Sequence, residues 1–197
     1  MPQVDFAKRQ MVCKIVYYGP GLSGKTTNLK YLHDNLPPDV RGRMMSLQTE
    51  KERTLFFDFF PAALGNLSGF DVRLHVFTVP GQSFYNETRR TLLMNVDGLV
   101  FVADSDETRF DANLDSYENL NENLASFSRG LKDIPLVVQY NKRDLAGAVP
   151  VEELRTHLNP LGVPEFEAIA IRGTGVFETQ RQIVKDVLVR VRKLMHT

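Results

Sequence analysis

The sequence lacks the features of secreted and membrane-spanning proteins. It contains one cysteine, Cys13, which has no partner for a disulfide within the chain and fits a reducing cytoplasm. No stretch approaches the roughly 20 consecutive apolar residues that a membrane-spanning helix needs. The ends of the sequence show neither a signal peptide nor a lipidation motif. We therefore expect a cytoplasmic protein without a direct membrane anchor.

A net charge is also absent. The 24 basic and 24 acidic residues cancel, which leaves no overall electrostatic attraction for nucleic acid or an anionic membrane. The histidines are scattered without the spacing of metal ligands, at His33, His75, His157 and His196. These observations disfavour a nucleic-acid-binding protein and a zinc protein. The function must therefore be inferred from a local site.

Strand-like and helix-like segments alternate along the chain. Runs rich in β-branched and aromatic residues predict strands at 12–18, 72–79, 98–103, 136–140 and 166–170. Apolar residues at helical spacing predict helices over 25–32, 112–127 and 176–194. This alternation is typical of an α/β protein with a mainly parallel sheet and helices on both faces, whose ligands bind beyond the carboxyl ends of the strands. No linker or repeat divides the chain, so we expect a single domain over 1–197.

The strongest motif follows the first predicted strand. Residues 19–26 read GPGLSGKT, a complete GxxxxGK[ST] pattern between a strand and a helix. Such a loop points backbone N–H groups at phosphate oxygens, and the positive end of the following helix adds to the field. Lys25 would reach the β- and γ-phosphates, and the Thr26 hydroxyl would bind Mg²⁺. The alternative, a glycine turn that merely joins a strand to a helix, is disfavoured by the full motif. The predicted phosphate-binding residues are Gly19, Gly21, Leu22, Ser23, Gly24, Lys25, Thr26 and Thr27.

A second motif indicates which base is bound. Asn141, Lys142 and Asp144 belong to the tetrapeptide NKRD, directly after the strand predicted at 136–140. An aspartate there can accept from N1–H and the exocyclic amino group of guanine, whereas adenine has an acceptor at N1 and no 2-amino group. Asn141 would hold the base edge and the phosphate-binding loop, the stem of Lys142 would cover the ring, and the backbone N–H of Ala170 could donate to guanine O6. NKRD alone also fits a polar turn, but after a phosphate-binding loop we favour guanine.

Two further segments have the composition of nucleotide-sensing loops. Gly81 follows the strand predicted at 72–79 and would let the backbone approach a γ-phosphate, while Gln82 would orient an attacking water. Upstream, a charged stretch at 50–54 precedes an aromatic run at 55–60. Its four phenylalanines fit either core strand positions or a surface exposed in one nucleotide state.

Together these motifs resemble the Ras-like small GTPase superfamily, and longer segments look like the bacterial MglA family of polarity and gliding-motility GTPases. The segments that carry this resemblance are VYYGPGLSGKTTNLK at 16–30, ERTLFFDF at 52–59, TVPGQ at 78–82 and VQYNKRDL at 138–145. The resemblance implies a P-loop NTPase of the Ras-like G-domain fold with a six-stranded sheet. It also implies GTP or GDP as ligand, with Mg²⁺.

The resemblance implies roles for particular residues. Thr54 would sense Mg²⁺ and the γ-phosphate, so Thr26 and Thr54 form the expected metal ligands. Arg53 would act as an arginine finger from within the chain, and with Lys25 and Gln82 it makes up the expected catalytic set. Ordinary Ras-like proteins carry an aspartate in place of Thr78, so we expect slow hydrolysis without a partner. The usual partner in the family is a Roadblock-type homodimer that stimulates hydrolysis, as MglB does.

We therefore expect a GTP/GDP switch that hydrolyses GTP and controls bacterial polarity or gliding motility through downstream effectors, with recruitment to a cell pole as an option. An alternative is a nucleotide-dependent module that recruits effectors with negligible intrinsic hydrolysis. A further alternative is an ATP-dependent kinase or ATPase in which NKRD is accidental.

Overall fold

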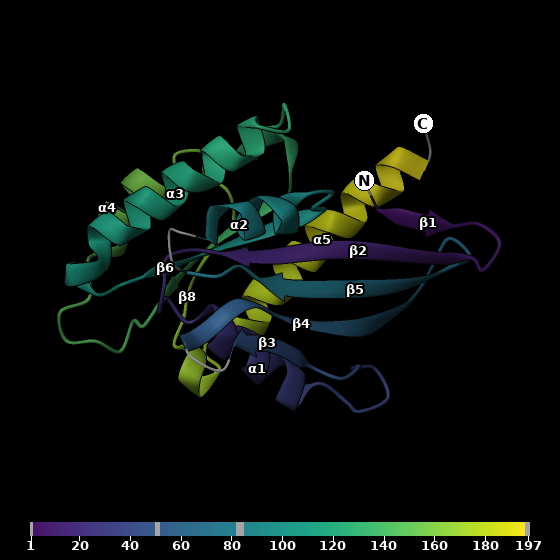
Figure 1. Ribbon diagram of the computed structural model, residues 1–197, viewed down its shortest axis with the longest axis horizontal. Coiled ribbons are helices and arrows are strands. Elements are labelled where there is room, and N and C mark those ends of the chain that lie inside the picture. The colour runs from purple at the N-terminus through teal and green to yellow at the C-terminus, as the bar shows by residue number, and fades with distance from the viewer. Residues whose placement is uncertain (1, 50–51, 82–84, 196–197) are drawn as a thin grey trace.

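The computed structural model describes residues 2–49, 52–81 and 85–195 (Figure 1). For residues 47–49 and 52–57 it describes the backbone alone. No helix of the described part of the chain is long and apolar enough to cross a bilayer.

The described residues form one mainly parallel sheet in the order β3-β4-β5-β2-β6-β7-β8, with β1 paired to β2. The pairs β2–β5, β2–β6, β6–β7 and β7–β8 are parallel, and β1–β2, β3–β4 and β4–β5 are antiparallel. The predicted fold class is confirmed, but the expected number of six strands is wrong, since this part of the chain contains eight. Their bounds are Gln3–Asp5 (β1), Gln10–Tyr18 (β2), Met45–Thr49 (β3), Glu52–Leu67 (β4), Phe70–Thr78 (β5), Gly98–Asp104 (β6), Leu136–Asn141 (β7) and Glu165–Glu167 (β8).

Helices cover both faces of the sheet, as Figure 1 shows. α1 and α5 pack on one face against the alternate β2 residues Cys13, Ile15 and Tyr17. α2, α3 and α4 pack on the other face, against Val16 and Tyr18. The helices predicted at 25–32, 112–127 and 176–194 are present, while α2 and α4 were not predicted. The bounds are Lys25–Asn35 (α1), Asn86–Leu93 (α2), Phe110–Ala125 (α3), Val151–Leu158 (α4) and Val176–Met195 (α5).

The central strands bring the sequence motifs to one edge of the sheet. All residues of β6 and β7 are buried, as expected for parallel strands covered on both faces. β2 ends at Tyr18, directly before the phosphate-binding loop, and β7 ends at Asn141, the first residue of NKRD. Because these strands run parallel, their carboxyl ends lie at the same edge, where doubly wound sheets bind ligands.

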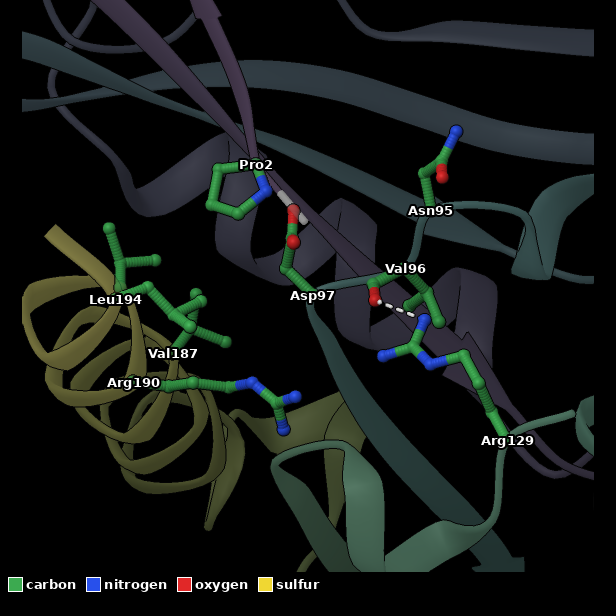
Figure 2. Close-up of a pocket in the computed structure, with 9 residues that line it drawn as sticks. Pro2, Asn95, Val96, Asp97, Arg129, Val187, Arg190 and Leu194 are labelled. Atoms are coloured by element: carbon green, nitrogen blue, oxygen red, sulfur yellow. Dashed lines mark hydrogen bonds between the residues drawn. The ribbon is translucent and has the colours of Figure 1, made fainter. Parts of the chain in front are cut away.

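The opposite edge carries a separate cavity of about 250 Å³ (Figure 2). Asp97, directly before β6, accepts a hydrogen bond from the Lys14 N–H at 2.8 Å. Arg129 donates to the Val96 carbonyl at 3.1 Å, and the side chains of Arg129 and Arg190 extend toward this cavity. The cavity lies at the amino end of β6, so it is distinct from the edge that carries the motifs.

Candidate nucleotide-binding site

The phosphate-binding loop has a backbone that requires glycine at two positions. Gly19 and Gly24 have φ of 140° and 96°. A Cβ at Gly19 would lie 2.2 Å from the Val102 carbonyl oxygen, and one at Gly24 would lie 2.1 Å from Asn141 Nδ2. The loop is therefore fitted closely between the ends of β6 and β7, which fixes where its N–H groups can meet a phosphate.

Lys25, the first residue of α1, has a buried side chain that folds back over the loop. Its Nζ donates to the carbonyl oxygens of Gly19 at 2.9 Å and Pro20 at 2.5 Å. Burial, aided by the positive charges of Arg89 and Arg109, lowers the pKa of Lys25 to about 7, although Asp58 and Asp104 act in the opposite direction. A bound polyphosphate would supply the negative charge that favours the ammonium form.

We expect nucleotide binding at pH 8 to take up close to one proton, because a lysine with a pKa of about 7 is mostly neutral there and an adjacent phosphate raises its pKa. The affinity for the nucleotide should accordingly fall as the pH rises above 7, because binding must then take up a proton. Titration calorimetry of GDP with Mg²⁺ in two buffers of different ionisation enthalpy measures the uptake. Equal apparent enthalpies in the two buffers would contradict this assignment of Lys25.

A carboxylate that the sequence did not single out lies beside Thr26. The Thr26 Oγ1 donates to Asp58 Oδ2 at 2.5 Å, and the Ser46 Oγ donates to Asp58 Oδ1 at 2.5 Å. The Asp58 N–H donates to Thr78 Oγ1 at 2.8 Å, and that hydroxyl lies 3.3 Å from Asp58 Oδ2. Asp58 is 1% exposed. β4 therefore places a carboxylate beside the neutral Thr78, where Ras-like proteins carry an aspartate of their own.

This pair of oxygen donors fits Mg²⁺. The ion prefers oxygen ligands, keeps several waters, and in nucleotide sites is bound through one or two carboxylates together with substrate phosphates. The Thr26 hydroxyl, in the residue after Lys25, and the Asp58 carboxylate that it contacts supply such oxygens. Asp58 is the one acidic residue within the aromatic run at 55–60. That isolation is the signal by which the sequence could have identified it, because a charged side chain is rarely buried without a partner.

The predicted base-reading residues line a second cavity, of about 250 Å³. Phosphate-loop and NKRD side chains meet there, although they are more than 110 residues apart in the sequence. The lining residues are Leu22, Gly24, Thr27, Asn141, Lys142, Asp144, Leu145, Ile169, Ala170 and Ile171.

Asn141 joins the loops around this cavity. Its Nδ2 donates to the Ser23 carbonyl at 2.7 Å, and its Oδ1 accepts from the Ala170 N–H at 2.9 Å. The Ala170 N–H, expected to donate to guanine O6, thus has a side-chain acceptor inside the protein. Ala170 also begins a 3₁₀ helix, Ala170–Arg172, whereas a strand was predicted over 166–170. The hydrogen bond from Asn141 to Ser23 joins the NKRD loop to the phosphate-binding loop.

Lys142 and Asp144 each lie close to a residue of opposite charge that the sequence analysis did not identify. Lys142 has a φ of 66°, and its Nζ lies 2.5 Å from Oδ2 of the fully buried Asp104 at the end of β6. The ion pair with Asp104 fixes the position of the Lys142 ammonium, and Lys142 also lines the base-reading cavity. Asp144 Oδ2 lies 3.7 Å from the guanidinium of the exposed Arg172. The short motif carries no information on these partners because they lie on other elements, Asp104 in β6 and Arg172 in the 3₁₀ helix Ala170–Arg172.

The switch residues are only partly described. A Cβ at Gly81 would lie 2.2 Å from the Cα of Gly21, so this glycine touches the phosphate-binding loop. Arg53 and Thr54 lie in β4, where only their backbone is described, and Gln82 lies outside the described residues. In the aromatic run, Phe60 is buried in the core and Phe59 stacks on Phe77 at 4.6 Å, so these two are structural.

The fold and the site define a small GTPase: a phosphate-binding loop and a base-reading loop meet at the carboxyl edge of a mainly parallel sheet. The chain belongs to the ADP-ribosylation factor family, whose sequence model matches residues 3–193. Guanine-nucleotide binding follows from this membership.

Individual relatives agree with this assignment. The chain is 51% identical to the mutual gliding-motility protein MglA of Myxococcus xanthus (strain DK1622), over 98% of this chain and 99% of that protein. It is 32% identical to ADP-ribosylation factor-like protein 3 of Caenorhabditis elegans, over 74% of this chain and 69% of that protein. ADP-ribosylation factor-like protein 6 of the same organism is 29% identical over 73% of this chain. The predicted resemblance to the MglA family is confirmed.

Proposed function

We propose that residues 1–197 form one G domain that acts as a GTP/GDP switch, binding GTP with Mg²⁺ and hydrolysing it to GDP and phosphate. The observation that carries this proposal is the meeting, at one sheet edge, of the Lys25 ammonium, the Thr26–Asp58 pair and the cavity lined by Asp144. Identifying the nucleotide that co-purifies with the protein tests the proposal, because a bound adenine nucleotide would contradict it. The proposed nucleotide-binding residues are Gly19, Gly21, Leu22, Ser23, Gly24, Lys25, Thr26, Thr27, Thr54, Gly81, Asn141, Lys142, Asp144 and Ala170.

In this proposal Thr26 and Thr54 bind Mg²⁺, and Asp58 supplies the carboxylate that position 78 lacks, directly or through a water. The ion would neutralise charge on the β- and γ-phosphates. Thr78 favours slow hydrolysis in the absence of a partner, because the carboxylate comes from β4 rather than from β5, the strand that leads into Gly81.

Replacing Asp58 with asparagine is expected to weaken Mg²⁺ binding by about 10- to 100-fold, as loss of a supporting ligand does in other metal sites. The carboxamide keeps the size and an acceptor for Thr26 but loses the negative charge. The measurement is the Mg²⁺ concentration that half-maximally slows GDP release. Asp71→Asn, an exposed aspartate at the other end of the sheet, is the matched control. An unchanged Mg²⁺ requirement in Asp58→Asn would remove this residue from the site.

The partner is proposed to be a Roadblock-type homodimer that orders Arg53, Thr54 and Gln82, with polarity or motility effectors downstream and the protein acting in the cytoplasm. The 51% identity to a protein named for mutual gliding motility supports this. Thr78 also supports a second candidate, an effector-recruiting module with negligible intrinsic hydrolysis. Phosphate release in a single turnover, with and without the Roadblock-type protein, separates the two, because only the first shows slow release alone.

A further inference from the structure

Arg89, on α2, is a buried cation beside the switch glycine. It is 4% exposed. Its Nε donates to the Pro80 carbonyl at 2.9 Å, and its Nη2 donates to the Gly81 carbonyl at 2.8 Å. Within the described ranges no carboxylate lies at ion-pair distance from it, so two successive carbonyls of the switch turn take the place of a counter-ion.

The guanidinium is itself held in place by two other elements. Its Nη1 donates to Asn119 Oδ1 of α3 at 2.8 Å, and it lies over the ring of Tyr18, 5.7 Å from the centroid. The Tyr18 hydroxyl donates to the same Asn119 oxygen at 2.6 Å, and Asn119 Nδ2 donates to Asn86 Oδ1 at 3.0 Å. The planar fork of Arg89 therefore has a fixed orientation when it reaches the switch turn.

This orientation determines where the Gly81 amide points. The described peptide bonds are all trans, and in a trans peptide the C=O and the following N–H point in opposite directions. Because the Pro80 carbonyl faces Arg89, the Gly81 N–H faces away from α2. Gly81 touches Gly21 on one side, and with Arg89 these two residues line a cavity of about 390 Å³ on another. The hydrogen bonds from Arg89 therefore add to the contact with Gly21 in fixing the turn.

We propose that Arg89 is a positioning residue for the GTP-bound state, which aims the Gly81 N–H at the γ-phosphate. The inference rests on the proposed GTP/GDP switch. GDP has no γ-phosphate and makes no use of this amide, so the contribution of Arg89 is confined to GTP. The residue thus raises the preference for GTP over GDP rather than the affinity for guanine nucleotides as such.

The test compares dissociation constants for GDP and for a non-hydrolysable GTP analogue in wild type, Arg89→Lys and Arg89→Ala. Both variants should lose about 10-fold or more in affinity for the analogue, the scale of one charge-assisted hydrogen bond, with GDP affinity within about twofold of wild type. Lysine keeps the positive charge, but it lacks the planar guanidinium that donates hydrogen bonds to both carbonyls and to Asn119 at once. Arg90→Lys and Arg90→Ala are matched controls, since Arg90 is the next residue of α2 and pairs with Glu87 on the surface.

An equal loss for both nucleotides, or no loss for either, overturns the inference. Asn119→Ala keeps the test decisive if the Arg89 variants do not fold, because it removes the anchor and leaves the donors to Pro80 and Gly81 in place. It should weaken the GTP analogue alone, and an effect on both nucleotides counts against a positioning role. Failure of the proposed function has a different signature, since wild type would then prefer neither GDP nor the analogue to adenine nucleotides.

Discussion

Asp144→Asn is expected to change the preferred nucleotide from GTP to XTP. The Asp144 carboxylate can accept from both N1–H and the 2-amino group of guanine, whereas asparagine offers one acceptor and one donor. Xanthine has a carbonyl in place of the 2-amino group, so the asparagine amide can pair with it. A site that leaves a buried polar group unpaired with the wrong ligand can discriminate by ~10⁴, and we expect a loss of GTP affinity approaching that size.

Competition between GTP and XTP for the purified protein measures the change. Glu167→Gln is the matched control, because Glu167 pairs with Arg143 of the same loop at 3.0 Å but does not line the cavity. Arg172 lies 3.7 Å from Asp144 and should pair less well with the neutral asparagine, so XTP need not recover the full original affinity. A variant that still prefers GTP over XTP would show that Asp144 does not read the base.

Local motifs predicted the parts of the site that a continuous stretch of sequence specifies. The loop at 19–26 and the NKRD loop each follow a buried strand, and parallel strands bring such loops to one edge. Asp58 could not be assigned in this way. Its contacts to Thr26 and Thr78 depend on the pairing of β4 with β5, which joins residues 20 positions apart, and on the packing of α1. The strand predicted at 166–170 was placed too late, because β8 ends at Glu167 and a 3₁₀ helix begins at Ala170.

The elements that the sequence did not reveal are short or break a local rule. α2 and α4 have 8 residues each, too few for a clear helical period. β4 extends from Glu52 to Leu67 through Pro61 and Gly65, residues that usually interrupt a strand. It pairs with β5 nevertheless, with a register shift between Ala63 and Gly65. Tertiary pairing therefore overrides the local preference in this strand.

β4 places Arg53 at a distance from the Thr26–Asp58 pair. β4 is extended from Glu52 onward, so the backbone of Arg53 lies about 16 Å along the strand from the backbone of Asp58, at roughly 3.3 Å per residue. Asp58 already contacts Thr26. In the proposed function, the partner brings Arg53 to the γ-phosphate.

Arg53→Ala is accordingly expected to reduce partner-stimulated hydrolysis by ~10³- to 10⁵-fold, the contribution of an arginine finger to phosphoryl transfer, and to leave nucleotide binding near normal. Gln82→Ala should also nearly abolish stimulated turnover, because the attacking water loses its orienting group. Single-turnover phosphate release with saturating Roadblock-type protein measures both, and Arg73→Ala, on an exposed position of β5, is the control. Unchanged phosphate release in the Arg53 and Gln82 variants would refute their roles. Loss of stimulated release with unaltered GDP and GTP affinity would instead show that these two residues act on the transition state, which is where the charge on the transferring phosphoryl group must be balanced.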